Sequence, residues 1–181
     1  MVSRAEADAF LLIIPSEVAH FTRDDNQQRK GGRGPRDNGS MAVIREQDLG
    51  KGRDAWHAWR EAAEAVIGGI SGEQARAGRL GVTPALPRPI MAMAVRYTLH
   101  LLERKAPGPG VEVRVAPWGA IKILDGPASD PHNLTPPDVI ELDPDVWLRL
   151  AAGITTWSEE KQAGHISAVG ERDDLSDLLP L

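Results

Sequence analysis

The hydrophobic pattern of the chain changes its period at residues 106–110, and this change constrains the fold more than any other feature. In residues 89–105, apolar side chains recur every three or four positions, which is typical of a helix. In "VEVRV" at 111–115, valines alternate with charged residues, which is typical of a half-buried strand. The intervening "APGPG" breaks the helix and is expected to form a turn. Separate blocks of the two periods predict an α+β domain.

Further strands are expected after this point. "AIKIL" at 120–124 repeats the alternation after "APWG", so the two segments predict an antiparallel hairpin. "VIEL" at 139–142 and "HISAVG" at 165–170 predict a third and a fourth strand. The polar loop at 125–138 is longer than most connections, and loops of this length are often functional. We expect a mainly antiparallel sheet.

Capping signals place the remaining helices. Asp54 is the expected N-cap of "DAWHAWREAAEAVIGGI", which ends at Gly68 and Gly69. "SGEQ" at 71–74 has the form of a capping box and predicts a helix that stops by Gly78 or Gly81.

The C-terminal part of the chain carries the clearest capping signals. Asp143 caps "PDVWLRLAA", which Gly153 ends. Thr156 and Glu159 form a capping box for a helix that Gly164 ends, and "DLSDLL" predicts a short final helix.

The first forty residues differ in character from the rest. Residues 22–40 contain no leucine, isoleucine, valine or aromatic residue, so this stretch is expected to be disordered. Residues 1–40 are interpreted as a flexible extension or as the result of a start site assigned upstream of Met41. We expect 41–87 to be a helical segment, 88–181 an α+β domain, and 41–181 together one compact unit.

Composition excludes several classes of function. The net charge of −5 argues against nucleic acid as a partner. The absence of cysteine excludes disulfides, thiolate metal sites and cysteine nucleophiles. "AFLLII" at 9–14 is too short to span a bilayer, so no integral membrane segment is predicted and a cytoplasmic protein is expected.

No catalytic or metal-binding constellation is apparent. No two of the histidines stand within ten positions of each other: His20, His57, His100, His132 and His165. Helix capping or an outward strand face accounts for most of the acidic group, which comprises Asp138, Glu141, Asp143 and Asp145. There is no nucleophile elbow and no phosphate-binding loop. We predict no catalytic residue, no metal and no cofactor.

Two features have both a binding and a structural interpretation. The apolar side chains of 89–105, methionines among them, either line a ligand pocket or form ordinary core. Arg114 either binds a ligand carboxylate or faces solvent beside a nearby acid. Periodicity does not separate these alternatives.

From about Arg88 onward, the chain resembles the bacterial, actinobacterial branch of the sterol carrier protein type 2 superfamily. The stretches that carry the resemblance are "AVRYTLHLLERKAPGPGVEVRVAPWGAIKIL", "GP" at 126–127, and "TPPDVIELDPDVWLRLAAG" followed by "SAVGERDDLS" and a terminal "LP". The resemblance implies about five strands covered on one face by helices, with an apolar tunnel for lipids between the layers.

On this basis we expect non-enzymatic binding of a lipid or other hydrophobic small molecule. The predicted contacts are Met91, Val95, Leu99, Arg114, Trp118, Ile121 and Ile123, with Arg114 as a headgroup partner. One alternative is an accessory domain related to mycothiol-dependent maleylpyruvate isomerases, although their metal-binding helical bundle would not fit into 41–87. Another is a structural or partner-binding module. The oligomeric state stays open.

Overall fold

The computed structural model describes residues 43–70, 75–126 and 138–181, all of which belong to a compact unit, Ser40–Leu181. Several predicted features lie outside these residues. They are the extension 1–40, the capping box at 71–74, most of the polar loop at 125–138, and His20 and His132.

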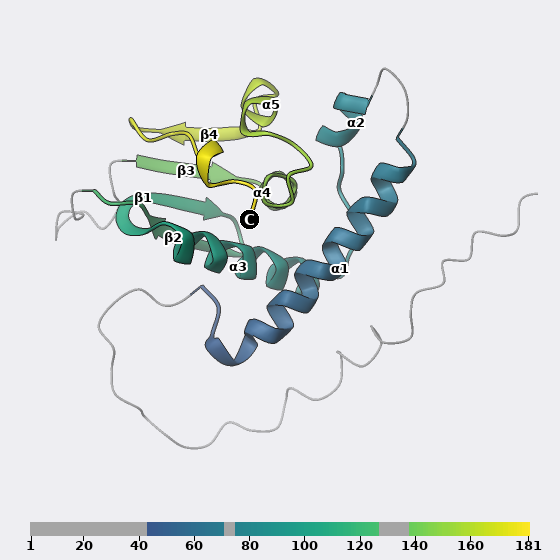
Figure 1. The fold of residues 1–181 in the computed structure, drawn as a ribbon, viewed down its shortest axis with the longest axis horizontal. Coiled ribbons are helices and arrows are strands. Elements are labelled where there is room, and N and C mark those ends of the chain that lie inside the picture. Colours follow the sequence, from purple (N-terminus) through teal and green to yellow (C-terminus); the bar gives the residue numbers. More distant parts are fainter. Residues whose placement is uncertain (1–42, 71–74, 127–137) are drawn as a thin grey trace, which may run out of the picture. The chain divides into compact units, whose positions relative to one another are not determined.

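The elements follow the predicted order of helices, hairpin, strand, helices, strand and a short final helix (Figure 1). They are η2 (Glu46–Asp48), α1 (Leu49–Gly68), α2 (Ala75–Leu80), α3 (Arg88–Lys105), β1 (Pro107–Val115), β2 (Gly119–Ile123), β3 (Asp138–Leu142), α4 (Pro144–Ala151), α5 (Trp157–Gln162), β4 (Ile166–Val169) and η4 (Ser176–Leu178).

The described strands form one mixed sheet in the order β2-β1-β3-β4. The β1–β2 hairpin is antiparallel as predicted, and β3 pairs with β4 antiparallel, but β1 and β3 are parallel. The prediction of a mainly antiparallel sheet of about five strands is therefore wrong in strand number and in one pairing. Alternation identifies a strand but is the same for both directions, so it does not reveal which neighbour the strand takes or how it runs.

Two predicted boundaries are also wrong. α1 begins at Leu49 rather than after Asp54. Its first turn contains Gly50 and Gly52, which disfavour a helix, and packing against α3 compensates for them. Residues 107–110 belong to β1 instead of forming a turn. The register shifts between Pro107 and Val111, and the Gly110 N–H still donates to the Leu124 carbonyl at 2.9 Å, so the segment continues the strand through an irregularity.

α4 and α5, the two helices that follow β3, begin and end at the positions that their capping residues predict. Gly153 and Gly164 adopt φ of +70° and +76°, a left-handed conformation that glycine adopts without strain. After each glycine the chain closes a Schellman motif, with Ile154 N–H donating to Arg149 O and His165 N–H to Glu160 O. The predicted capping box is complete: the Thr156 side chain accepts from the Glu159 N–H, and the Glu159 side chain accepts from the Thr156 N–H. Asp143 stands at the N-cap of α4, but its side chain makes no capping hydrogen bond.

One face of the sheet, α1, α3 and α4 build a common core. The inward residues of β1, β2 and β3 are almost wholly buried, as are Trp59 and Ala63 of α1 and Trp147 of α4, whereas those of β4 are partly buried. Figure 1 shows α3 running alongside β1 and β2 while α1 crosses α3. The outward strand positions carry Glu112, Arg114 and Glu141.

Candidate functional site

The apolar layer between α3 and the sheet brings together six of the seven predicted contact residues. Val95, Leu99 and Ile123 have no exposed surface, and Ile121 is 4% exposed. Met91 and Trp118 are partly buried and pack against the same cluster. The α3 residues project from successive turns of one helix face, and the strand residues occupy alternate positions of β2, so both periodicities point into this layer.

The α4 side of this layer is closed by a buried hydrogen-bond chain. Trp147 Nε1 donates to Thr98 Oγ1 at 2.8 Å, and the Thr98 hydroxyl lies 2.9 Å from the Ala94 carbonyl. Thr98 and Trp147 have no exposed surface. Since a buried polar group is costly unless it is paired, this chain fixes α4 against α3.

The β1–β2 turn forms a polar end of the layer that the sequence did not predict. The Arg88 guanidinium lies 4.9 Å from the centre of the Trp118 ring, and Arg96 Nε donates to the Trp118 carbonyl at 3.0 Å. Trp118 Nε1 is buried and has no hydrogen-bond partner within the described parts of the chain. Two cations and an unused donor therefore adjoin the predicted apolar contacts. No local signal reveals them, because Trp118 is distant in sequence from both arginines.

Arg114 lies on the opposite face of the sheet from this layer. Strand alternation separates it from Val113 and Val115, which are buried. Its Nε is 2.6 Å from Glu112 Oε1, and the hydrogen bond from Arg114 to Glu112 raises the pKa of Arg114. The geometry favours the surface ion pair, the second of the two interpretations of this residue.

At the other end of the sheet, Asp138 is clamped by the segment after β4. Arg172 Nε donates to Asp138 Oδ2 at 2.7 Å, and the Glu171 N–H donates to Oδ1 at 2.9 Å. Arg172 also donates to the carbonyls of Gly110 and Asp125. Burial alone would raise the pKa of Asp138, but these hydrogen bonds outweigh it and the pKa is lowered. This carboxylate joins three chain segments, a structural role.

The other members of the acidic group are dispersed. Glu141 is exposed on the outward face of β3, as predicted. Burial raises the pKa of Asp145, which is half-buried in the first turn of α4. Within residues 43–70, 75–126 and 138–181, no group of three or more His, Asp or Glu side chains is arranged to hold a metal ion.

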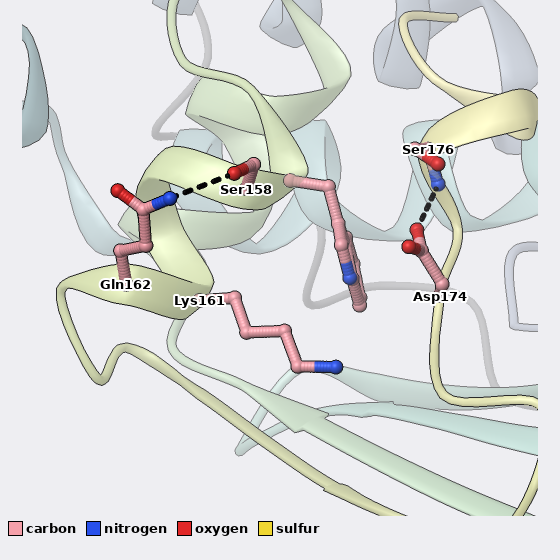
Figure 2. Close-up of a pocket in the computed structure, with 6 residues that line it drawn as sticks. Ser158, Lys161, Gln162, Asp174 and Ser176 are labelled. Carbon is pink, nitrogen blue, oxygen red and sulfur yellow. Dashed lines mark hydrogen bonds between the residues drawn. The ribbon is translucent and has the colours of Figure 1, made fainter.

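A surface hollow of about 350 Å³ lies between α5 and η4 (Figure 2). Its polar groups largely satisfy one another. Gln162 Nε2 donates to Ser158 Oγ at 3.1 Å, the Ser176 N–H donates to the Asp174 carboxylate at 2.8 Å, and Lys161 Nζ lies 2.8 Å from Asp173. The Lys161 charge is therefore balanced by Asp173, and the Asp174 carboxylate, whose printed partner is a neutral N–H, leaves the hollow without a positive charge to attract an anion.

Comparison with known proteins identifies one family. The family model described as bacterial SCP ortholog matches residues 87–181, which include α3, the whole described sheet, α4 and α5. A search among curated proteins gives no match. Among the helices of the described residues, none has the length and apolar character needed to cross a membrane.

Proposed function

Because this chain belongs to the bacterial SCP ortholog family, we propose that it binds, without catalysis, a lipid or other hydrophobic small molecule between α3 and the sheet. The observation that carries the proposal is the match over residues 87–181, which contain the α3–sheet layer. The cytoplasmic location and the absence of a nucleic-acid partner stay predictions.

Apolar burial would supply most of the affinity. Each buried methylene contributes about 0.8 kcal/mol, so a chain of eight methylenes gives roughly 6 kcal/mol before the costs of ordering. Val95, Leu99 and Ile123 contact their neighbours with no exposed surface. A ligand that reaches them must therefore part α3 from β2, and we expect binding to be slower than diffusion.

The polar end at the β1–β2 turn fits the headgroup of such a molecule. Arg88 and Arg96 supply positive charge, and Trp118 Nε1 supplies a buried donor that has no partner among the described residues. A carboxylate or phosphate there would receive charge-assisted hydrogen bonds while its apolar chain enters the layer.

Native mass spectrometry of the purified protein, followed by organic extraction, tests the proposal directly. We expect an acyl lipid or similar molecule to be released at near-stoichiometric amounts, or a mass shift on addition of fatty acid. If the protein has its unliganded mass and this mass shifts with neither fatty acids nor sterols, the proposal is wrong, and a partner-binding module becomes the better interpretation.

A matched pair of arginine variants tests where the headgroup lies. We expect Arg88→Gln to weaken fatty-acid affinity about tenfold, the usual scale for a lost charged hydrogen bond. Arg114→Gln should leave it unchanged, because Arg114 is paired with Glu112 on the other face. Competition with a fluorescent fatty acid measures both. If Arg114→Gln is the weaker binder, the sequence-based headgroup assignment is correct instead.

A further inference from the structure

A second surface hollow, of about 330 Å³, lies between α1 and α3 and differs in charge from the one beside α5. Its lining combines basic, aromatic and apolar side chains: Leu49, Gly50 and Arg53 of α1, and Tyr97, His100, Leu101 and Arg104 of α3. We propose that this hollow binds an anionic group, a phosphate or carboxylate, carried on a small apolar or aromatic molecule.

The close approach of the two helices builds the hollow. Gly52 is buried in α1, and a Cβ added there would lie 2.9 Å from Tyr97 Cβ and 2.8 Å from Ile44 Cδ1. No larger residue fits without displacing these atoms. The tight crossing sets Arg53 opposite the α3 face on which residues 97, 100, 101 and 104 recur at helical spacing.

The basic side chains of the hollow have no counter-charge. Arg53, His100 and Arg104 make no hydrogen bond or ion pair with any part of the chain that the structure describes, and no carboxylate lines the hollow. The nearby Asp48 is already paired with Arg45 and Lys51.

Six of the eleven arginines in the described residues form an ion pair with a carboxylate, whereas Arg53, Arg60, Arg88, Arg96 and Arg104 do not. Arg88 lies over the Trp118 ring, Arg96 donates to the Trp118 carbonyl and Arg60 is exposed outside the hollow, so Arg53 and Arg104 differ from these three in lining one hollow together. A position in the last turn of α3, where the helix dipole favours a cation, accounts for Arg104. It does not account for Arg53, which faces the same hollow.

The chemistry of the lining defines the ligand class. Two guanidinium groups facing one hollow repel each other, and an anion between them removes this repulsion. Their planar donors match the oxygens of phosphate or carboxylate. Leu49, Leu101 and Tyr97 add apolar surface for the organic part of the molecule. α1 lies outside residues 87–181, so only the α3 side of the site falls within the family match, and the site does not depend on lipid binding in the α3–sheet layer.

Titration of the full chain with phenyl phosphate and with inorganic phosphate, followed by amide chemical shifts, tests this site. We expect both to shift the amides of 49–53 and 97–104, and phenyl phosphate to bind more tightly. Arg53→Gln and Arg104→Gln should each weaken binding about tenfold. Arg60→Gln, an exposed arginine of α1 outside the hollow, is the matched control.

Sedimentation with phosphatidylglycerol or phosphatidylcholine vesicles distinguishes the source of the anion. Arginine-dependent binding to the anionic vesicles alone assigns the phosphate to a lipid headgroup, whereas phenyl phosphate binding without vesicle binding assigns it to a soluble molecule. The proposal is overturned if neither probe binds, or if Arg53→Gln and Arg104→Gln behave like Arg60→Gln. Both arginines are exposed, so unchanged melting temperatures will show that the variants are folded.

Discussion

The Glu160 carboxylate lies wholly inside the protein, where three side chains hold it. Arg149 Nε and Thr155 Oγ1 donate to its Oε1 at 2.8 and 2.7 Å, and His165 Nδ1 lies 2.6 Å from Oε2. Arg149 is only 3% exposed and also donates to the Val82 carbonyl. This network joins α4, α5 and the connection that precedes α3, so its integrity affects more than one element.

We expect Glu160→Gln to destabilise the fold by about 3 to 5 kcal/mol at pH 7, because it leaves the Arg149 cation buried without a counter-charge. Chemical denaturation measures the loss. Glu64→Gln, on an exposed side of α1, should change stability by less than about 0.5 kcal/mol. Equal effects of the two variants would mean that the buried pair contributes nothing specific.

The pH dependence of this effect has a definite sign. Burial alone would raise the pKa of Glu160, but the hydrogen bonds from Arg149, His165 and Thr155 outweigh it, and the pKa is lowered. The ionised carboxylate therefore stabilises the fold above its unfolded pKa of about 4.3, and this stabilisation is lost as the pH falls through the folded pKa. The difference between wild type and Glu160→Gln should shrink on acidification below about pH 4.3.

At the scale of elements, we expect substitution by alanine to have opposite effects on stability at two glycines of α1, Gly52 and Gly50. Gly52→Ala should cost about 1 to 3 kcal/mol, since its Cβ would meet Tyr97 and Ile44 at under 3 Å. Gly50→Ala should stabilise by about 0.5 to 1 kcal/mol, since a Cβ there meets nothing within 4 Å and alanine favours a helix. Thermal unfolding of the two variants is the measurement. If both variants were more stable, the helices α1 and α3 would be able to move apart at Gly52 at little cost in free energy.

The elements that were predicted correctly are those whose signals are local. The end of α1, the extent of α3, the capping box of α5 and its terminal glycine all follow from residues within a few positions of one another. The start of α1 was missed because Gly50 and Gly52 disfavour a helix and only contact with α3 compensates. A signal was available: Gly52 stands at helical spacing before Trp56, Trp59 and Ala63, which indicates close packing on that face.

The features of the candidate site also fall into those with a local signal in the sequence and those without one. Periodicity assigned Val95 and Leu99 to the apolar face of a helix and Ile121 and Ile123 to that of a strand, and the family resemblance grouped them in one layer, but neither distinguished a pocket wall from core. The charges adjoining Trp118 and the uncompensated arginines between α1 and α3 arise from segments far apart in the chain. Pairings of this kind depend on tertiary structure, as does the parallel β1–β3 ladder, and a single sequence does not specify them.

At the scale of the whole molecule, the core extends beyond the region that the family model matches. Trp59 and Ala63 of α1 have no exposed surface, and Trp56 and Ile44 are 6% exposed. All four precede residue 87, where the family match begins. The α3–sheet layer therefore has a second helix packed behind it, and the helix that covers the proposed lipid site is itself held from both sides.

Truncation tests this dependence. Truncating a buried tryptophan to alanine usually costs about 3 to 5 kcal/mol, so losing Trp56 and Trp59 together removes roughly the whole stability of an ordinary domain, 5 to 15 kcal/mol. We expect a Val82–Leu181 fragment to show no cooperative melting transition by circular dichroism. A Ser40–Leu181 chain should melt like the full protein, because it keeps the whole compact unit. A cooperative transition of the shorter fragment near the full-length midpoint would mean that α1 is an added layer rather than part of the fold. The proposed lipid site would then have to function without it, whereas the anion site between α1 and α3 would not exist in that fragment.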